Sequence, residues 1–240
     1  QERAASLVME GSTVDLMGGT LNGDVVFSGT NTNTISIVDT TINGAFRQTG
    51  GTVNVNAWDD EHFQDTSISD GTMNFKGQDF SLTTFTLSSN SAVVNFSENL
   101  NINSAGALDV GAGSVFVVSN LLADTGATLT VGAGSVDVGG DMTLNAGSSL
   151  VVGRSTITEV TGPVTNLVTN VTVFAGSVSV VSNLLADAGA ALTVTNGSID
   201  VGGDMTLNAG SSLTVVTGSV LVGLDLVAAG TTLTFGEGSV

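Results

Sequence analysis

The chain repeats one short hydrophobic pattern, a pair of residues two positions apart, mostly apolar, that returns every 18 to 21 positions. Residues with this spacing place both side chains on the same face of a β-strand. Turn-forming Gly, Ser, Asn and Asp separate the short apolar stretches, and no segment shows the 3.6-residue period of a capped helix. The pattern therefore predicts an all-β chain. The first members of the pairs form one column: Val14, Ile35, Val53, Met73, Val94, Val115, Val136, Ile157, Val178, Ile199, Val220 and Val240.

A longer repeat overlies the short one. The segment 112–152 returns 63 residues later as 175–215, with about 34 of 41 positions identical. Each period of about 21 residues holds three apolar stretches, as at 115–117, 121–123 and 129–131. The sequence therefore predicts coils of about 21 residues, each with three strands of three to five residues and three corners.

Repeats of this kind predict a single-stranded parallel β-helix of roughly 11 coils, forming a single β-solenoid domain over residues 1–240. Residues one period apart should lie directly above one another, because each coil satisfies its backbone hydrogen bonds only through its neighbours. One coil alone buries too little apolar surface to offset the entropy lost on ordering it. We expect less regular coils in residues 1–93 and regular ones, with the 63-residue superrepeat, in residues 94–240.

A second column, made of Asn and Asp, supports the same register. Asx residues tolerate the left-handed conformation at corners, and stacked amides can hydrogen-bond from coil to coil. We interpret this column as a structural ladder rather than a ligand site. Its members lie at 21-residue intervals: Asn103, Asp124, Asn145, Asn166, Asp187 and Asn208.

The repeat units resemble those of bacterial surface β-solenoids. The segment VGGDMTLNAGSSL at 138–150 and 201–213, with GATLTVGAGSVDV at 126–138, is similar to repeats of autotransporter passenger domains and filamentous-haemagglutinin-like adhesins. The resemblance covers residues 94–240 well and residues 11–93 in pattern only. It implies a right-handed coil and an exported protein at the cell surface or outside the cell.

The charge balance is strongly acidic, with 22 Asp and Glu side chains against Arg3, Arg47, Lys76 and Arg154. Four scattered cations cannot neutralise the phosphates of a nucleic acid or bind an anionic lipid surface. The absence of cysteine excludes disulfides and thiol chemistry. No apolar run reaches the roughly 18–20 residues that cross a bilayer. We therefore expect neither a nucleic-acid partner nor a membrane span.

Two acidic regions could hold a metal ion. The first contains the only Trp and the only His among four carboxylates; oxygen-rich clusters suit Ca²⁺ and His with carboxylates suits a transition metal, but we favour a solvated acidic turn. In the second, carboxylates one coil apart would repel unless a cation or a turn amide lies between them, so calcium bridging is an alternative. No other cofactor is expected. The candidate ligands are Asp59, Asp60, Glu61, His62 and Asp65 in the first region and Asp204 and Asp225 in the second.

An outward face carries Thr and Ser beside the third strand, from Thr128 and Thr130 to Thr232 and Thr234. Ice-binding solenoids present such rows, but cross-strand packing in any parallel sheet also produces them. We favour lateral bundling of rods through this Thr/Ser face over ice binding. Catalytic β-helices need a groove with paired carboxylates, or a base beside metal-held acids. The four cations neighbour no acid cluster in the sequence, so we predict that the protein is not an enzyme.

The ends of the chain show no convincing polar cap, which a monomeric solenoid needs to protect its open coils. Copies that stack head to tail through their terminal coils would form filaments, because such contacts do not close. The sequence thus predicts a non-enzymatic extracellular structural protein that stacks end to end into a cell-surface filament or matrix fibre. The alternatives are an adhesin-like passenger stalk that binds a host molecule or glycan, and an ice- or calcium-binding surface protein.

Overall fold

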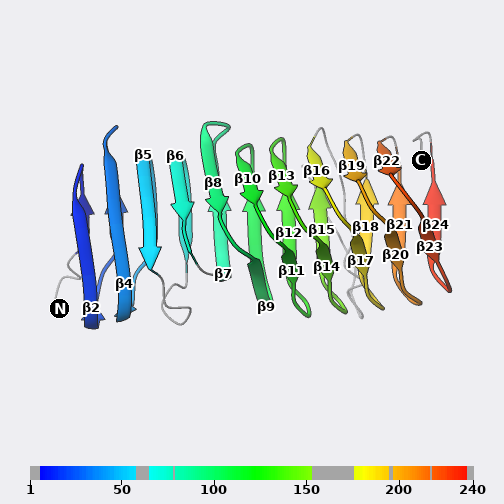
Figure 1. Cartoon of the computed structure of the whole chain (residues 1–240), viewed down its shortest axis with the longest axis horizontal. Helices are drawn as coiled ribbons and strands as arrows, with labels where there is room; N and C mark the ends of the chain where they lie inside the picture. The colour runs from blue at the N-terminus through cyan, green and yellow to red at the C-terminus, as the bar shows by residue number, and fades with distance from the viewer. Residues whose placement is uncertain are drawn as a thin grey trace, which may run out of the picture.

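The computed structural model describes residues 6–57, 65–77, 79–152, 176–194, 197–216 and 218–236. Within these ranges the regular elements are all β-strands and their pairings are parallel. The strands stack along one axis, with the N-terminal strands at one end and the C-terminal strands at the other (Figure 1). The predicted parallel β-solenoid is confirmed, with about nine turns spaced about 21 residues apart. The right-handed coil and the total of roughly 11 coils stay predictions.

From Ser114 onwards each described coil has three strands of three or four residues, as the sequence predicts. The first face comprises β10 (Ser114–Val117), β13 (Ser135–Val138), β16 (Ser177–Val180), β19 (Ser198–Val201) and β22 (Ser219–Val222). The second face comprises β11 (Leu121–Ala123), β14 (Met142–Leu144), β17 (Leu184–Ala186), β20 (Met205–Leu207) and β23 (Leu226–Ala228). The third face comprises β12 (Thr128–Val131), β15 (Ser149–Val152), β18 (Ala191–Val194), β21 (Ser212–Val215) and β24 (Thr232–Phe235).

In the N-terminal part, short strands merge into longer ones that bend round a corner while remaining paired, so the prediction of three short strands in every coil does not hold there. A single residue in the left-handed region turns the chain without ending the strand, as at Asp39 in β4 (φ 51°) and Ala105 in β9 (φ 58°). The strands of this part are β1 (Leu7–Met9), β2 (Thr13–Leu21), β3 (Val25–Phe27), β4 (Thr32–Ile42), β5 (Phe46–Ala57), β6 (Thr66–Phe75), β7 (Phe80–Leu87), β8 (Ala92–Phe96) and β9 (Leu100–Val110).

The predicted column of stacked residues is correct over most of its length and shifted at one step. Val115 pairs with Val94 on one side and with Val136 on the other. At β4 and β5, however, Val53 pairs with Asn33 rather than with Ile35. The spacing of 18 residues between Ile35 and Val53 is too short for a coil with three faces, so the ladder keeps a spacing of 20 and slides by one inward position. Asn33 is buried as a result.

The ladder also steps over one predicted coil. Val136 pairs directly with Val178, and β14 and β15 pair in the same way with β17 and β18. The predicted column members Ile157 and Asn166 lie outside the described residues, and the predicted stacking of Ile157 on Val136 is wrong.

The sequence offers a physical reason for this step. Glu159 stands where other coils have an inward apolar residue, and burying a carboxylate is costly. One period from Pro163 on either side, Met142 and Leu184 each donate a backbone N–H to the neighbouring coil, to Asn183 O and Asp204 O. Proline has no N–H to donate, so a coil built on Pro163 would lose this bond.

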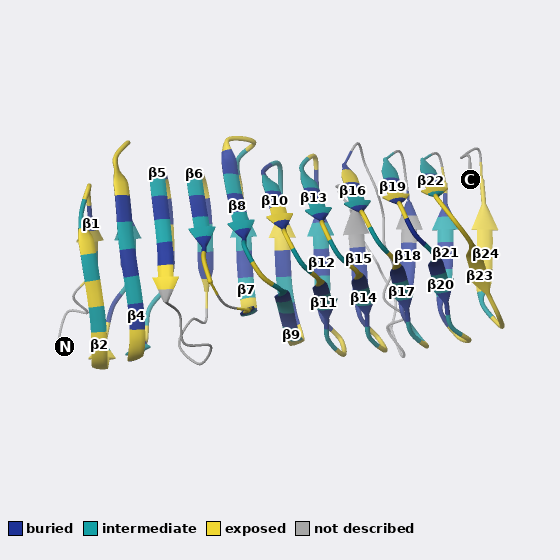
Figure 2. Cartoon of the chain, viewed as in Figure 1, coloured by how far each residue is buried: buried dark blue, intermediate teal, exposed yellow. Residues whose placement is uncertain are grey.

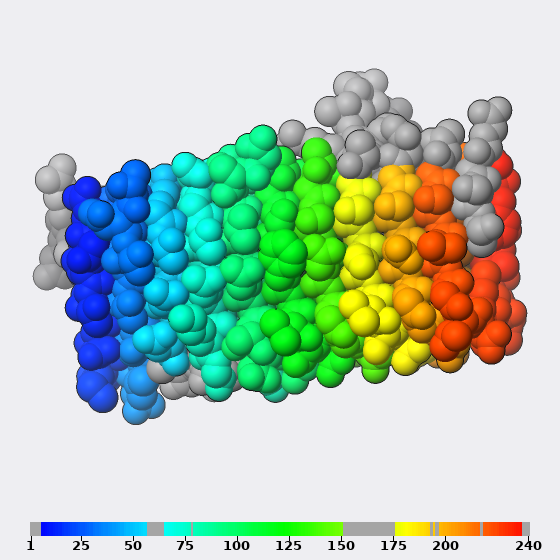
Figure 3. Space-filling view, turned by 45° about the horizontal axis from the view of Figure 1, so that its top comes forward, coloured from blue at the N-terminus to red at the C-terminus, as the bar shows by residue number. Residues whose placement is uncertain are grey.

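The inward residues of all three faces form one continuous core along the rod. Figure 2 shows the buried positions alternating with exposed ones along the strands. Four phenylalanines pack together near the middle of the chain, with ring centroids 4.3 Å apart for Phe75 and Phe80 and 4.9 Å apart for Phe75 and Phe96. Coils further along are filled by Val, Leu, Ile, Met and Ala. The space-filling view shows successive coils following one another along the long axis (Figure 3).

Candidate functional site

A row of Asn and Asp residues runs along the corner between the first and second faces, and we call it the Asx corner ladder. At each step the side-chain Oδ1 of one residue accepts the backbone N–H of the corresponding residue one coil further on, over 2.8 to 3.2 Å. The side chain thereby satisfies a corner amide that no strand can pair. The ladder consists of Asp79, Asn99, Asn120, Asp141, Asn183, Asp204 and Asp225.

The second pair of candidate metal ligands belongs to this ladder. The backbone N–H of Asp225 donates to Oδ1 of Asp204 over 3.1 Å, so a turn amide lies between the two coils where a cation was the alternative. The described residues hold no group of three or more acidic or histidine side chains placed to bind a metal ion. Calcium bridging at Asp204 and Asp225 stays a prediction.

The first acidic region is only partly visible. Asp59, Asp60, Glu61 and His62 lie outside the described residues. Asp65 is exposed immediately before β6, and its backbone carbonyl accepts the N–H of Phe46. The structure therefore describes the backbone role of Asp65 in joining two coils.

The Asx column singled out in the sequence lies at the next corner, between the second and third faces, and it works in pairs. Asn145 Nδ2 donates to Asp124 Oδ1 over 3.0 Å, and Asn208 Nδ2 donates to Asp187 Oδ1 over 2.7 Å. On the other side of Asp124 the donor is Ser104 Oγ, the neighbour of Asn103. These donors, Asn145 first, hold the pKa of Asp124 below its usual range.

Each of these corners is a tight turn of the same kind. In the sequence Asx-x-Gly-x, the backbone N–H of the fourth residue donates to the carbonyl of the Asx residue over 2.8 to 3.0 Å. The third residue is a glycine with positive φ, which is the requirement of a type II turn. The four turns begin at Asp124, Asn145, Asp187 and Asn208, with glycines Gly126, Gly147, Gly189 and Gly210.

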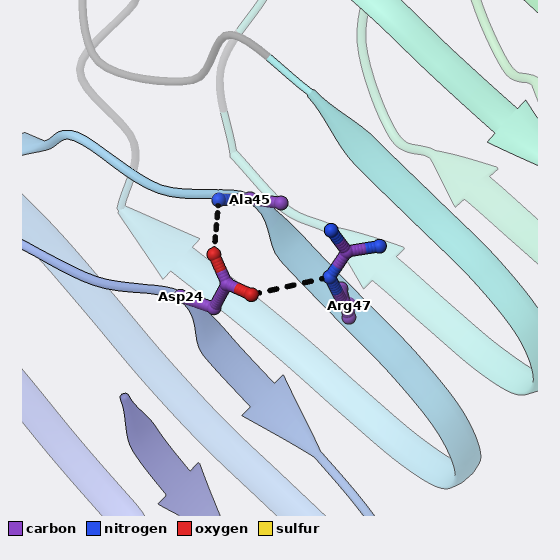
Figure 4. Close-up of polar contacts among 3 residues, drawn as sticks. All are labelled: Asp24, Ala45 and Arg47. Carbon is purple, nitrogen blue, oxygen red and sulfur yellow. Dashed lines mark hydrogen bonds and ion pairs between the residues drawn. The ribbon is translucent and has the colours of Figure 1, made fainter. Parts of the chain in front are cut away.

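Two further polar contacts escaped the sequence analysis. In the first, the backbone N–H of Ala45 donates to Asp24 Oδ1 over 2.9 Å and Arg47 Nε lies 3.3 Å from Asp24 Oδ2 (Figure 4). The Ala45 amide, with a smaller contribution from Arg47, holds the pKa of Asp24 below its usual range. Because Asp24 and Arg47 are both well exposed, the ion pair adds little stability.

The second is an amide ladder on the outward side of the first face. Asn95 Nδ2 donates to Asn74 Oδ1 over 2.7 Å, and Asn74 Nδ2 donates to Asn54 Oδ1 over 3.0 Å. The signal in the sequence is an Asn one position after the first residue of three successive apolar pairs. Such a ladder links coils through side chains as well as backbone.

The Thr/Ser face is not uniformly open. Ser149 and Ala191, which occupy outward positions of β15 and β18, are both buried, and Ser149 Oγ lies 3.3 Å from Thr128 Oγ1. Thr232 and Thr234 on β24 are exposed. Lateral bundling through this face therefore stays a prediction, with exposed threonines at its C-terminal end.

The stack ends in a coil whose inward residues are uncovered. Leu226, Leu233 and Phe235 pair with Met205, Leu213 and Val215, all of which are buried. Their own side chains nevertheless remain 36%, 39% and 45% exposed.

At the opposite end of the rod, the inward apolar residues Leu7, Val14, Leu16 and Leu21 pack against the core but are only half-buried. Each end of the described stack thus presents apolar core surface.

No protein-family model matches the sequence, and no curated protein and no solved structure shows significant similarity to it. Among the described residues there is also no helix long and apolar enough to cross a membrane.

Proposed function

We propose that this chain is a non-enzymatic structural protein of the cell surface or extracellular matrix, a rigid β-solenoid rod that stacks end to end with copies of itself. The observation that carries the proposal is the uncovered core of the C-terminal coil, where Leu226, Leu233 and Phe235 point along the inward column without a covering coil. Burying such side chains is worth roughly 1.5–3 kcal/mol each.

Backbone chemistry supports the same joint. The free edges of β22, β23 and β24 face outward along the rod axis at one end, and those of β1 and β2 do so at the other (Figure 1). Unpaired strand edges are templates for further parallel pairing. A head-to-tail contact between unlike ends does not close, so it extends into a filament.

The corner chemistry supports a structural role in place of a catalytic one. The described carboxylates of the Asx corner ladder accept backbone amides of the next coil, which uses them to hold coils together. Export to the cell surface, as in the bacterial solenoids that the repeats resemble, suits a long rod with a strongly acidic composition.

Sedimentation velocity and negative-stain microscopy of the purified 240-residue chain test the proposal. We expect rods that lengthen into fibres as the protein concentration rises. The double variant Leu233→Asp with Phe235→Asp should remain in single short rods, because carboxylates would be buried at the joint.

A matched control is Leu221→Asp, which alters a side chain on the same terminal coil that is also exposed but stands at an outward position, beside Asp200. This variant should polymerise like the unaltered chain. Single rods at all concentrations, or fibres that survive the double substitution, would contradict end-to-end stacking.

A further inference from the structure

A shallow groove crosses the outward side of the first face, between the coils of β10, β13 and β16. Its volume is about 240 Å³. Two of its walls are exposed valines, Val118 (67%) and Val181 (65%), which follow β10 and β16 and stand 63 residues apart in the superrepeat. Its outward-facing lining is Phe116, Val118, Asp137, Gly139, Ser179 and Val181.

Glycine keeps the groove open between the two valines. Gly139 occupies the corresponding position after β13, and a Cβ there would collide with the backbone carbonyl oxygen of Val118. The middle coil therefore contributes bare backbone where its neighbours contribute isopropyl groups, and the space between Val118 and Val181 stays unfilled.

One carboxylate lies in this apolar setting. Asp137 is the Cα partner of Phe116 on one side and of Ser179 on the other. It is half-buried, and the desolvation raises the pKa of its carboxyl above the usual range. The aromatic ring of Phe116, 40% exposed, stands one strand spacing away on the same face.

We propose that this groove binds an arginine side chain presented by a partner protein. A purely apolar occupant would desolvate the Asp137 carboxylate further without pairing it, which is costly. A guanidinium is planar and weakly hydrated, it pairs with a carboxylate through two parallel hydrogen bonds, and it stacks on an aromatic face. Its methylene stem fits between the valines, whereas the compact and strongly hydrated ammonium of lysine fits this setting less well.

The molecule contains its own comparison site. Asp200 is the counterpart of Asp137 in the second copy of the superrepeat, and its Cα partners are Ser179 and Leu221. There Ser179 replaces the aromatic ring of Phe116, and Asp200 is exposed. The same carboxylate without the ring and the paired valines should bind arginine poorly.

Methyl NMR of the folded chain tests the inference, with N-acetyl-arginine N-methylamide as the probe and its lysine and citrulline analogues as controls. The methyl signals of Val118 and Val181 should shift in a saturable manner with the arginine probe. Asp137→Asn should weaken binding by about tenfold, the loss of one charge-assisted pair in a partly desolvated site. Phe116→Ser, which copies position 179, should weaken it by a few fold.

Asp200→Asn is the matched control and should leave the affinity unchanged, while the methyl spectrum reports that each variant is folded. The inference is overturned by any of three results: no saturable shift at the two valines, equal affinity for citrulline and arginine, or equal loss in Asp200→Asn and Asp137→Asn. These outcomes are independent of end-to-end stacking, because the groove lies on the side of the rod.

Discussion

At the scale of single residues, the corners depend on Asx side chains that each do two things. The side chain accepts or donates a hydrogen bond to the next coil, and in the turns between the second and third faces the backbone carbonyl of the same residue accepts the bond that closes the turn. A corner amide left without a partner would cost roughly 1–3 kcal/mol. This dual use explains why Asn and Asp, rather than other polar residues, stand at these positions.

Asp124 allows this role to be measured through pH. Its pKa in the folded protein lies below the ordinary value of 3.8, because Asn145, Thr125 and Ser104 donate to its carboxylate. A lowered pKa means that the ionised form stabilises the fold above the unfolded-state value, and that this contribution is lost as pH falls through the folded-state pKa. Asn145→Ala should therefore raise the pKa of Asp124 toward 3.8 and lower the melting temperature at pH 7.

Carboxyl-carbon NMR titration of both proteins, together with melting curves from neutral to acid pH, checks this expectation. The difference in melting temperature should narrow in acid, once Asp124 is protonated in both proteins. If Asp124 already titrated at its ordinary value in the unaltered chain, the hydrogen bonds would not stabilise the charged form.

At the scale of the coil, glycines serve two different purposes, and substitution separates them. Gly147 has φ 72°, and the atom nearest to a Cβ added there is the backbone nitrogen of Gly126, at 4.0 Å. Gly147→Ala therefore meets only the left-handed backbone penalty of about 1–2 kcal/mol. At Gly132, a methyl group would collide with the backbone carbonyl of Gly111 in the coil below. We expect Gly132→Ala to cost about 3 kcal/mol, since neighbouring coils must separate.

Urea unfolding of the two alanine variants provides the comparison. A larger loss for Gly147→Ala than for Gly132→Ala would show that turn conformation, and not the close approach of coils, limits the sequence at these corners.

The strands and their stacking were predictable because a period of 21 residues repeats the same inward pairs, as at Val94, Val115 and Val136. The slip at Val53 was not, because the apolar pattern alone leaves Ile35 and Asn33 as competing partners. The direct pairing of Val136 with Val178 had a visible signal in Glu159 and Pro163. The groove at Asp137 required the structure, since its walls come from coils whose spacing in the ladder is 42 residues.

At the scale of the whole molecule, each coil contacts only its neighbours, so stability should vary along the rod. A terminal coil has one neighbour, and the inward side chains of β23 and β24 remain exposed. In a one-dimensional stack such a coil opens more easily than a central coil held on both sides. Hydrogen exchange should thus be fast at β22 to β24 and slow at β13 and β14 in dilute protein.

Assembly changes this expectation in a specific way. If the C-terminal coil of one copy is covered by the N-terminal coil of the next, the amides of β22 to β24 gain partners and should slow toward the rate of the central coils, while β13 and β14 change little. Exchange measured by mass spectrometry at low and high protein concentration separates the two states. Lateral bundling alone would leave the strand edges at the rod ends open and their amides fast. Protection confined to the terminal strands would therefore identify axial stacking, and its absence in visible fibres would assign their growth to side-by-side contacts.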